Sequence, residues 1–246
     1  MKINVVIPMA GLGSRFAKEG YKKPKPFIDV LGKPMIERVI ENLRLENATY
    51  ILIARKEHIE TEKELIKNLK VKYDVHFVGI DKVTEGAICT VLHTRKFINN
   101  DSPLLLANCD QIVDVDIQSY INDCFQKKAD GSILTFIDEE KNPKWSFAKV
   151  NDNDWVTEVK EKEPISKYAT VGLYFFSKGK YCVNYGIDMI VRNDRVNNEF
   201  YTCPIYGYAI KDKKKITHFL IDSKKMYGIG IPEDLNKFIK INPLNY

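Results

Sequence analysis

Residues 3–15 read INVVIPMAGLGSR, an apolar run that ends in two closely spaced glycines. The run is short and β-branched, which is typical of a buried strand. Gly11 and Gly13 follow it directly, and glycine lets the backbone turn tightly and expose its N–H groups. Such N–H groups bind anions, and Arg15 and Lys25 add positive charge. The stretch therefore predicts a polyphosphate-binding loop at the carboxyl end of the first strand.

Two better-known phosphate-binding loops do not fit this stretch. The dinucleotide fingerprint needs a third glycine three residues after Gly13, and Phe16 stands there. The P-loop needs Gly-Lys-Ser/Thr after four spacer residues, and the stretch has no such sequence. An ordinary glycine turn among solvated lysines stays open as the explanation of Gly-x-Gly taken alone.

Residues 1–131 alternate between apolar runs and helical periodicity. Strands are predicted at 3–10, 50–54, 75–78 and 103–107, and helices at 34–43, 56–70, 85–94 and 116–127. This alternation predicts an α/β fold, with a Rossmann-like, mostly parallel mixed sheet flanked by helices. Ligands of such sheets bind beyond the carboxyl ends of the strands. We therefore expect Gly11–Arg15, Thr84–Ala87 and Asn108–Gln111 to meet at one edge.

From residue 132 the sequence no longer alternates between strand and helix patterns. Strands are predicted at 132–138, 147–150, 155–160, 168–176 and 215–221, helices at 178–191 and 232–241, and 197–211 is ambiguous. No linker rich in Gly or Ser divides the chain, so we predict a single domain over residues 1–246, with parts at about 1–131 and 132–246.

Composition excludes several classes of protein. No run of about 18 apolar residues is present, so we expect no membrane span, and without a signal-peptide pattern we expect a cytoplasmic protein. Five scattered cysteines predict reduced thiols and no structural zinc. The net charge of +5 suits a polyanion such as a triphosphate, although a lysine-rich coding bias explains it equally well. The lysines are spread out, so we expect no nucleic-acid partner.

Three ordered motifs carry a resemblance to a known family. Gly-x-Gly-x-Arg at 11–15, Lys25-Pro26 and Gly32-Lys33-Pro34-Met35 together resemble the nucleotidyltransferases of the nucleoside-diphospho-sugar pyrophosphorylase type. Such enzymes join a nucleoside triphosphate to a phosphorylated small molecule and release pyrophosphate. The resemblance implies that residues 1–131 hold the nucleotide and 132–246 the acceptor. It implies catalytic roles for Arg15 and Lys25, and nucleotide binding by Ala10, Gly11, Leu12, Gly13 and Ser14.

The resemblance also implies a metal site. Family members hold Mg²⁺ with an aspartate after the fourth strand, which corresponds to Asp110, and Asn108 would bind the nucleotide beside it. A strand-end turn is the other explanation of Asp110. Glycosyltransferases of related architecture use Asp-x-Asp, but we expect Asp116 of Asp114–Asp116 to cap a helix. Many members have a second metal aspartate where this chain has Gly228, and Asp222 is a weak substitute.

The turn at 84–87 is where the family holds the nucleobase, which implies binding by Glu85, Gly86 and Ala87. An ionised carboxylate only accepts hydrogen bonds. Glu85 would therefore suit a base with an exocyclic amino group, which favours CTP. Capping of the following helix by Glu85 is an equally good explanation.

Acceptor binding is implied at three residues of the second part. Lys162 matches the family lysine that holds the acceptor phosphate, although an extra residue precedes Pro164 and Lys160 could substitute for it. Gly172 would permit close approach of a ligand, and Glu199 would contact acceptor hydroxyls. The alternative is a solvated charge run at 160–163 and an exposed carboxylate at 199.

The combined motifs at 85–87, 108–111 and 197–201 most resemble a capsule-cluster subgroup that joins CTP to phosphoglutamine. The expected function is therefore a Mg²⁺-dependent cytidylyltransferase of capsule or surface polysaccharide biosynthesis. A hexose-1-phosphate uridylyl- or thymidylyltransferase, a glycosyltransferase that uses a ready-made nucleotide sugar, and a non-catalytic nucleotide-binding protein are the alternatives. The sequence fixes neither the acceptor nor the oligomeric state.

Overall fold

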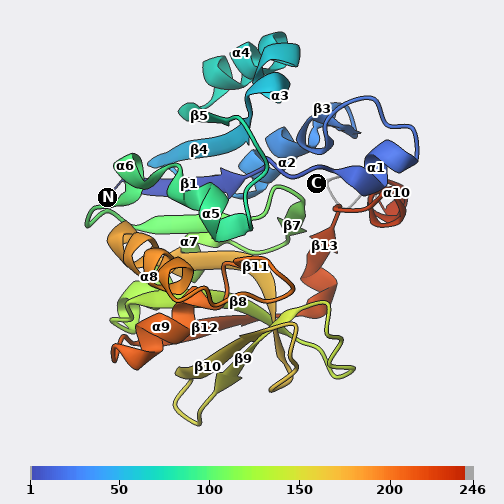
Figure 1. The fold of residues 1–246 in the computed structure, drawn as a ribbon. Helices are drawn as coiled ribbons and strands as arrows, with labels where there is room; N and C mark the ends of the chain where they lie inside the picture. The colour runs from blue at the N-terminus through green and yellow to red at the C-terminus, as the bar shows by residue number, and fades with distance from the viewer. Residues whose placement is uncertain (1, 242–246) are drawn as a thin grey trace.

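A nine-stranded sheet forms the centre of the part of the chain that the structure describes, in the order β10-β9-β11-β6-β1-β4-β5, with β8 against β11 and β12 against β8 (Figure 1). We describe residues 2–241 of the computed structural model. The strands are β1 (Ile3–Pro8), β4 (Ala48–Arg55), β5 (Val75–Ile80), β6 (Leu104–Ala107), β8 (Gly131–Ile137), β9 (Ser146–Val150), β10 (Val156–Glu161), β11 (Tyr168–Phe176) and β12 (Ile216–Ile221). The first four are parallel, and β11 joins them antiparallel to β6.

Helices cover both faces of this sheet. They are α1 (Ser14–Lys18), α2 (Met35–Asn42), α3 (Lys56–Thr61), α4 (Lys63–Lys72), α5 (Ala87–Leu92), α6 (Arg95–Ile98), α7 (Ile117–Gln126), α8 (Gly179–Val191), α9 (Ile205–Lys211) and α10 (Pro232–Ile241). This arrangement confirms the predicted fold class. Within residues 2–241, no helix has both the length and the apolar character needed to cross a bilayer.

Strand β1 is buried on both faces, which explains its unbroken apolar sequence. Val5 and Ile7 belong to the core under α2 and α7, whereas Val6 belongs to the core under α5 and α8. The loop that follows β1 is therefore held by a strand that has no freedom to shift.

Two predicted helices differ from the observed ones. The predicted helix at 56–70 is divided at Glu62, whose φ of −108° interrupts the helix between α3 and α4. The Thr61 hydroxyl donates to the His58 carbonyl just before the break, a back-bonding contact that bends helices. The predicted helix at 85–94 begins only at Ala87.

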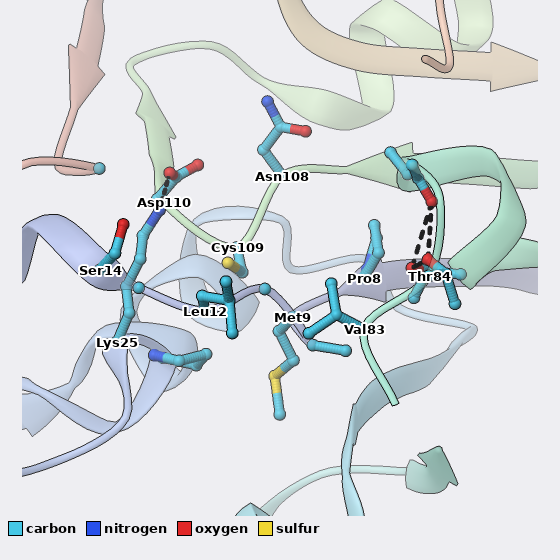
Figure 2. Close-up of a pocket in the computed structure, with 18 of the residues that line it drawn as sticks. Pro8, Met9, Leu12, Ser14, Lys25, Val83, Thr84, Asn108, Cys109 and Asp110 are labelled. Atoms are coloured by element: carbon cyan, nitrogen blue, oxygen red, sulfur yellow. Dashed lines mark hydrogen bonds and ion pairs between the residues drawn. The ribbon is translucent and has the colours of Figure 1, made fainter. Parts of the chain in front are cut away.

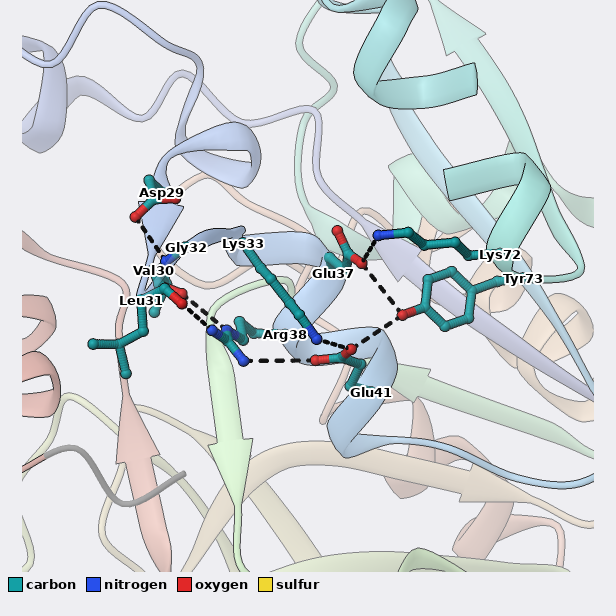
Figure 3. A network of polar contacts seen from close by, with 10 residues as sticks. All are labelled: Asp29, Val30, Leu31, Gly32, Lys33, Glu37, Arg38, Glu41, Lys72 and Tyr73. Carbon is teal, nitrogen blue, oxygen red and sulfur yellow. Dashed lines mark hydrogen bonds and ion pairs between the residues drawn. The ribbon is translucent and has the colours of Figure 1, made fainter. Parts of the chain in front are cut away.

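Segment 25–35 reaches α2 through a short hairpin of β2 (Asp29–Val30) and β3 (Lys33–Pro34). Leu31 and Gly32 between them have φ values of 54° and 82°, which is the geometry of a type I′ turn. Arg38 of α2 holds this turn, because its Nε donates to the Val30 carbonyl at 2.9 Å and its Nη2 to the Leu31 carbonyl (Figure 3).

The anchoring extends to α4 through a chain of polar contacts (Figure 3). Glu41 accepts from Lys33 and from Tyr73, and the Lys72 Nζ lies 2.8 Å from a Glu37 carboxylate oxygen. The hairpin, α2 and the end of α4 are thereby tied together, which fixes the path of the chain after Lys25.

A small second ladder joins β7 (Gln111–Val113) to β13 (Met226–Gly228). Asn42 of α2 clamps this ladder, because its Nδ2 donates to the Val113 carbonyl at 2.6 Å and its Oδ1 accepts from the Val113 N–H at 2.9 Å. Since β7 starts directly after Asp110, this clamp fixes the backbone on which that carboxylate stands.

Replacing Asn42 with leucine should lower the free energy of unfolding by about 2–4 kcal/mol, because both polar groups of Val113 lose their partner. The measurement is chemical denaturation. Asn122→Leu on the exposed face of α7 is the control and should change stability by no more than about 0.5 kcal/mol. Equal losses for the two variants would contradict the clamp.

Candidate functional site

A cavity of about 640 Å³ lies beyond the carboxyl ends of β1 and β6. The residues that line it come from six separate parts of the chain: Pro8–Phe16, Lys25–Pro26, five residues of the turn after β5 and the start of α5 (Val83, Thr84, Gly86, Ala87 and Thr90), Asn108–Asp110, Glu199 and Gly230. The loop after β1, the turn after β5 and the turn after β6 therefore meet at one edge, as the strand order predicts.

The loop after β1 is shaped to bring Lys25 close. Gly13 has a φ of 61°, and a Cβ on it would lie 3.1 Å from the Lys25 Cβ. A larger residue would be strained there and would push Lys25 away. Helix α1 begins immediately afterwards, so the exposed Arg15 also borders the cavity. The loop amides, Arg15 and Lys25 together form a cationic end.

Lys25 and Asp110 form an ion pair inside the cavity (Figure 2). Burial alone would lower the pKa of Lys25, but the charge of Asp110 and the hydrogen bond to it outweigh burial and raise that pKa. Lys25 is therefore a cation at neutral pH. Burial raises the pKa of the neighbouring Cys109 thiol to about 12, so this thiol is neutral.

Gly230 closes the cavity against this pair. A Cβ at Gly230 would lie 2.4 Å from an Asp110 carboxylate oxygen and 3.4 Å from the Lys25 Nζ. A side chain at this position would therefore displace the Asp110 carboxylate from where it stands, and the segment after β13 restricts where that carboxylate can point.

Asp110 is the carboxylate best placed to hold a metal ion. No cluster of three or more His, Cys, Asp or Glu side chains occurs within residues 2–241. A single carboxylate is still a donor set that Mg²⁺ can use, because Mg²⁺ usually binds proteins with one or two carboxylates and keeps phosphate oxygens and water as its other ligands.

The two other acidic candidates serve as helix caps. Asp116 accepts from the N–H groups of Gln118 and Ser119 at the start of α7, which confirms its predicted capping role. Asp222 accepts from the Lys224 N–H and caps the short 3-10 helix at 223–225.

The turn after β5 is docked against residue 200. The Phe200 N–H donates to the Glu85 carbonyl at 2.8 Å, and the Ile88 N–H donates to the Phe200 carbonyl at 3.2 Å. Gly86 lies between them with a φ of 140°, and a Cβ there would lie 2.3 Å from the Phe200 carbonyl oxygen. Gly86 and Ala87 line the cavity from this turn.

Glu85 is not brought to the cavity, contrary to the sequence-based prediction. Its side chain is 66% exposed and forms an ion pair with Arg195. Arg195 lies over the Phe200 ring at 4.1 Å, so it holds the carboxylate outside the cavity. Glu85 does not cap α5 either, because the N-cap is Gly86 and no side chain bonds there.

Glu199 reaches the cavity from a tight turn. Val196 and Glu199 exchange two backbone hydrogen bonds of 3.0 and 2.9 Å. Asn197 and Asn198 between them have φ values of 48° and 62°, which is again the type I′ geometry that asparagine tolerates. The turn brings Glu199 to the cavity wall next to the turn after β5, against which its neighbour Phe200 is docked.

Lys162 stands beside this turn and does not line the cavity itself. Its Nζ donates to the Tyr201 hydroxyl at 2.6 Å. This hydrogen bond raises the pKa of Lys162, as do the charges of Glu161 and Glu199. Burial raises the pKa of Glu161, which accepts a hydrogen bond from Ser146. The Lys162 ammonium and the carboxyl groups of Glu161 and Glu199 therefore lie close to one another beside the cavity.

Gly172 makes room for Asn108. Its φ is 93°, and a Cβ there would lie 2.3 Å from the Asn108 Nδ2. Asn108 lines the cavity and Gly172 does not, so Gly172 acts on the site by leaving space for the Asn108 amide beside it.

Sequence reasoning missed Val83, Thr90 and Gly230 as lining residues. Thr90 had a usable signal, because it lies four residues after Gly86 and so faces that glycine across one turn of a helix. Val83 and Gly230 had none, since both depend on contacts between distant segments.

Comparison with known proteins identifies a family. The sequence profile of the family described as "Nucleotidyl transferase" matches residues 4–203. The solved structure of a nucleoside-diphosphate-sugar pyrophosphorylase from Vibrio cholerae RC9 superimposes with a TM-score of 0.81 at 23% identity, covering 96% of this chain and 99% of that one. At this identity the structural likeness supports the fold.

Three curated relatives differ in how much of their length is matched. The bifunctional protein GlmU of Methanococcus aeolicus is 27% identical over 71% of this chain, but the match spans only 40% of GlmU. The UTP–glucose-1-phosphate uridylyltransferase AglF of Haloferax volcanii is 24% identical, over 78% of this chain and 85% of AglF. The D-glycero-α-D-manno-heptose 1-phosphate guanylyltransferase of Campylobacter jejuni is 23% identical, over 96% and 99% of the two chains.

Replacing Gly86 with alanine should cost at least about 2 kcal/mol of unfolding free energy, because the new Cβ meets the Phe200 backbone and the φ disfavours it. Gly207→Ala is the matched control in α9, where the new Cβ meets only Val159 at 3.6 Å. It should stabilise the protein by about 0.5–1 kcal/mol. Denaturation curves test both, and an unchanged Gly86→Ala curve would refute the docking of residue 200 on this turn.

Proposed function

The chain belongs to the nucleotidyl transferase family, and from this premise we propose that it transfers a nucleotidyl group from a nucleoside triphosphate to a phosphorylated small molecule. Pyrophosphate is the second product. The observation that carries the proposal is the Lys25–Asp110 pair, which faces the glycine loop inside one cavity.

The cationic end of the cavity is the proposed site of the triphosphate. Arg15 and the backbone amides of Leu12–Ser14 would hold the β- and γ-phosphates, because N–H groups and a guanidinium bind phosphate oxygens well. Lys25 would contact the α-phosphate and the departing oxygen. Its raised pKa keeps the positive charge that this role needs.

The reaction itself requires no general base. An anionic oxygen of the acceptor phosphate attacks the α-phosphorus and forms a new P–O bond. The bond between the α-phosphorus and the bridging oxygen breaks, and pyrophosphate leaves with that electron pair. What the protein must supply is alignment of two anions and stabilisation of the charge in the transition state.

Mg²⁺ is the proposed cofactor, held by Asp110 together with phosphate oxygens. Bound there, it would neutralise charge on the phosphates and orient them. Asp110 is already directed into the cavity by Lys25 and Gly230.

The acceptor is proposed to bind near Lys162, Glu199 and Gly172. Lys162 would bind the acceptor phosphate, and Glu199 borders the cavity on the same side. Two carboxyl groups, Glu161 and Glu199, lie close enough to influence the Lys162 pKa. This charge pattern suits an acceptor that carries an ammonium group besides its phosphate, as phosphoglutamine does.

CTP is the proposed nucleotide, and surface polysaccharide synthesis the proposed context. Both rest on the motifs at 85–87, 108–111 and 197–201. The curated relatives include a uridylyltransferase and a guanylyltransferase, so membership of the family does not choose the base. These two relatives are named for glucose 1-phosphate and for a heptose 1-phosphate, so a sugar 1-phosphate, such as a hexose 1-phosphate, is the competing acceptor.

Use of a ready-made nucleotide sugar receives less support. That reaction would require Asp114 and Asp116 as metal ligands. The carboxylate oxygens of Asp116 instead accept hydrogen bonds at the N-terminus of α7. A reaction of that kind would also leave the ion pair between Lys25 and Asp110 without a role.

Replacing Lys25 with methionine should lower the rate of pyrophosphate release by about 100- to 1,000-fold, the usual loss when one charge-stabilising donor is removed. A coupled pyrophosphate assay with CTP, Mg²⁺ and phosphoglutamine, alongside UTP, dTTP and hexose 1-phosphates, gives the rate. Lys22→Met changes an exposed lysine of the same segment and should leave the rate within about twofold of wild type. The proposal would be refuted by near-normal turnover of Lys25→Met, or by a wild-type protein that releases no pyrophosphate with any combination of nucleotide and acceptor.

Lys162→Met should raise the KM of the acceptor by about tenfold or more while the KM of the nucleotide stays unchanged, because one charged contact to phosphate is lost. Lys160→Met is the control, since Lys160 lies two residues before Lys162 and is an exposed ion-pair partner of Glu163. Steady-state kinetics with each substrate varied separates the two constants. A larger effect from Lys160 would transfer the acceptor role to that residue.

A further inference from the structure

The cavity has two chemically different ends. Figure 2 shows Lys25 with Asp110 on one side and Val83 with Thr84 on the other. The second end is lined by Val83, Thr84, Gly86, Ala87 and Thr90, none of which carries a charge. If the proposed function holds, the triphosphate occupies the cationic end, and the nucleobase must lie against these uncharged residues.

Two hydroxyl groups at the uncharged end share one carbonyl. The Thr84 hydroxyl oxygen lies 2.9 Å from the Gly86 carbonyl oxygen and 2.5 Å from the Thr90 hydroxyl oxygen. The Thr90 hydroxyl oxygen lies 3.3 Å from the same carbonyl oxygen. The three oxygens therefore form a closed triangle in which the carbonyl can only accept.

Counting protons shows what this triangle can offer to a ligand. Each threonine hydroxyl has one proton and two lone pairs. In either arrangement, one threonine hydroxyl donates its proton to the other hydroxyl, and that second hydroxyl donates its own proton to the Gly86 carbonyl. Both protons are thus used inside the triangle, and lone pairs are what remains for the cavity.

The triangle is held rigidly. Thr90 is only 7% exposed, and its hydroxyl bonds back across one turn of α5, as threonine does in helices. The Phe200 backbone fixes the turn on both sides of Gly86. The hydroxyls therefore cannot move away from a base, and turning a proton toward the ligand would break a bond inside the triangle.

We propose that Thr84 and Thr90 form a hydrogen-bond acceptor pair that selects a base with an exocyclic amino group, so that cytosine is bound in preference to uracil or thymine. An amino N–H of the base can donate a hydrogen bond to a lone pair of either threonine hydroxyl, and no hydrogen bond inside the triangle has to break. A carbonyl oxygen at the same ring position faces another acceptor, and sites with an unpaired polar group discriminate strongly.

The test is equilibrium binding of CTP and UTP, each with Mg²⁺, to the full chain by titration calorimetry without any acceptor. CTP and UTP differ at ring position 4 by an amino group against a carbonyl. Wild type should bind CTP at least about tenfold more tightly than UTP, and Thr84→Val/Thr90→Val should bring the ratio of affinities to within about threefold of unity.

Conservative variants keep the test informative if the double variant is unstable. Thr84→Ser and Thr90→Ser preserve the hydroxyls and should retain the preference for CTP. Thr157→Val, an exposed threonine of β10, should also retain it. Glu199→Gln tests the competing explanation, which is that the Glu199 carboxylate and not the threonine pair accepts the hydrogen bond from the amino group. Glu199 is the charged hydrogen-bond acceptor that lines the cavity beside the turn after β5.

Three results would overturn the inference: UTP bound as tightly as CTP by wild type, an unchanged ratio in the double variant, or loss of the preference in Glu199→Gln alone. Selective CTP binding without pyrophosphate release from any substrate pair would refute the proposed function and leave this inference standing. Absence of binding by both nucleotides would overturn both.

Discussion

The ion pair between Lys25 and Asp110 is the interaction on which the site depends. Each charge is partly buried, and either one left alone would be poorly solvated, so the pair holds its two segments at one distance. Those segments are otherwise unrelated, since one follows the glycine loop and the other follows β6. Two side chains of α2 hold the backbone on either side of this ion pair. Arg38 fixes the hairpin after Lys25, and Asn42 fixes the strand after Asp110.

Much of the fold is readable from local sequence, because buried parallel strands and amphipathic helices leave strong periodic patterns. The run at 3–10 and the cap at Asp116 are examples, since each depends on residues within a few positions. The predicted helix at 56–70 fails at Glu62, where a local backbone change leaves the apolar pattern intact. Strands β7 and β13 have three residues each, too few for any period to be visible.

The site is less readable, because its chemistry is set by contacts between distant residues. The glycine loop, Lys25 and Asp110 could be found, since motifs with fixed spacing carry them. Glu85 could not be placed, because its partner Arg195 is 110 residues away. Sequence reasoning assigned the base contact to the one charged residue of the turn. The lone pairs that face the cavity belong to threonines whose arrangement depends on the fold of the turn.

The difference between Glu85 and the threonine pair has a physical reason. A carboxylate at the base end would present hydrogen-bond acceptors, but it would also repel a ligand that carries several negative charges, and the low dielectric of a cavity increases that repulsion. A hydroxyl pair whose protons are used internally presents acceptors without adding charge. The Glu85 carboxylate lies outside the cavity, where Arg195 forms an ion pair with it. The threonine pair can therefore discriminate between bases without adding a negative charge to that of Glu199, which also lines the cavity, and so without further weakening the attraction of Arg15 and Lys25 for phosphate.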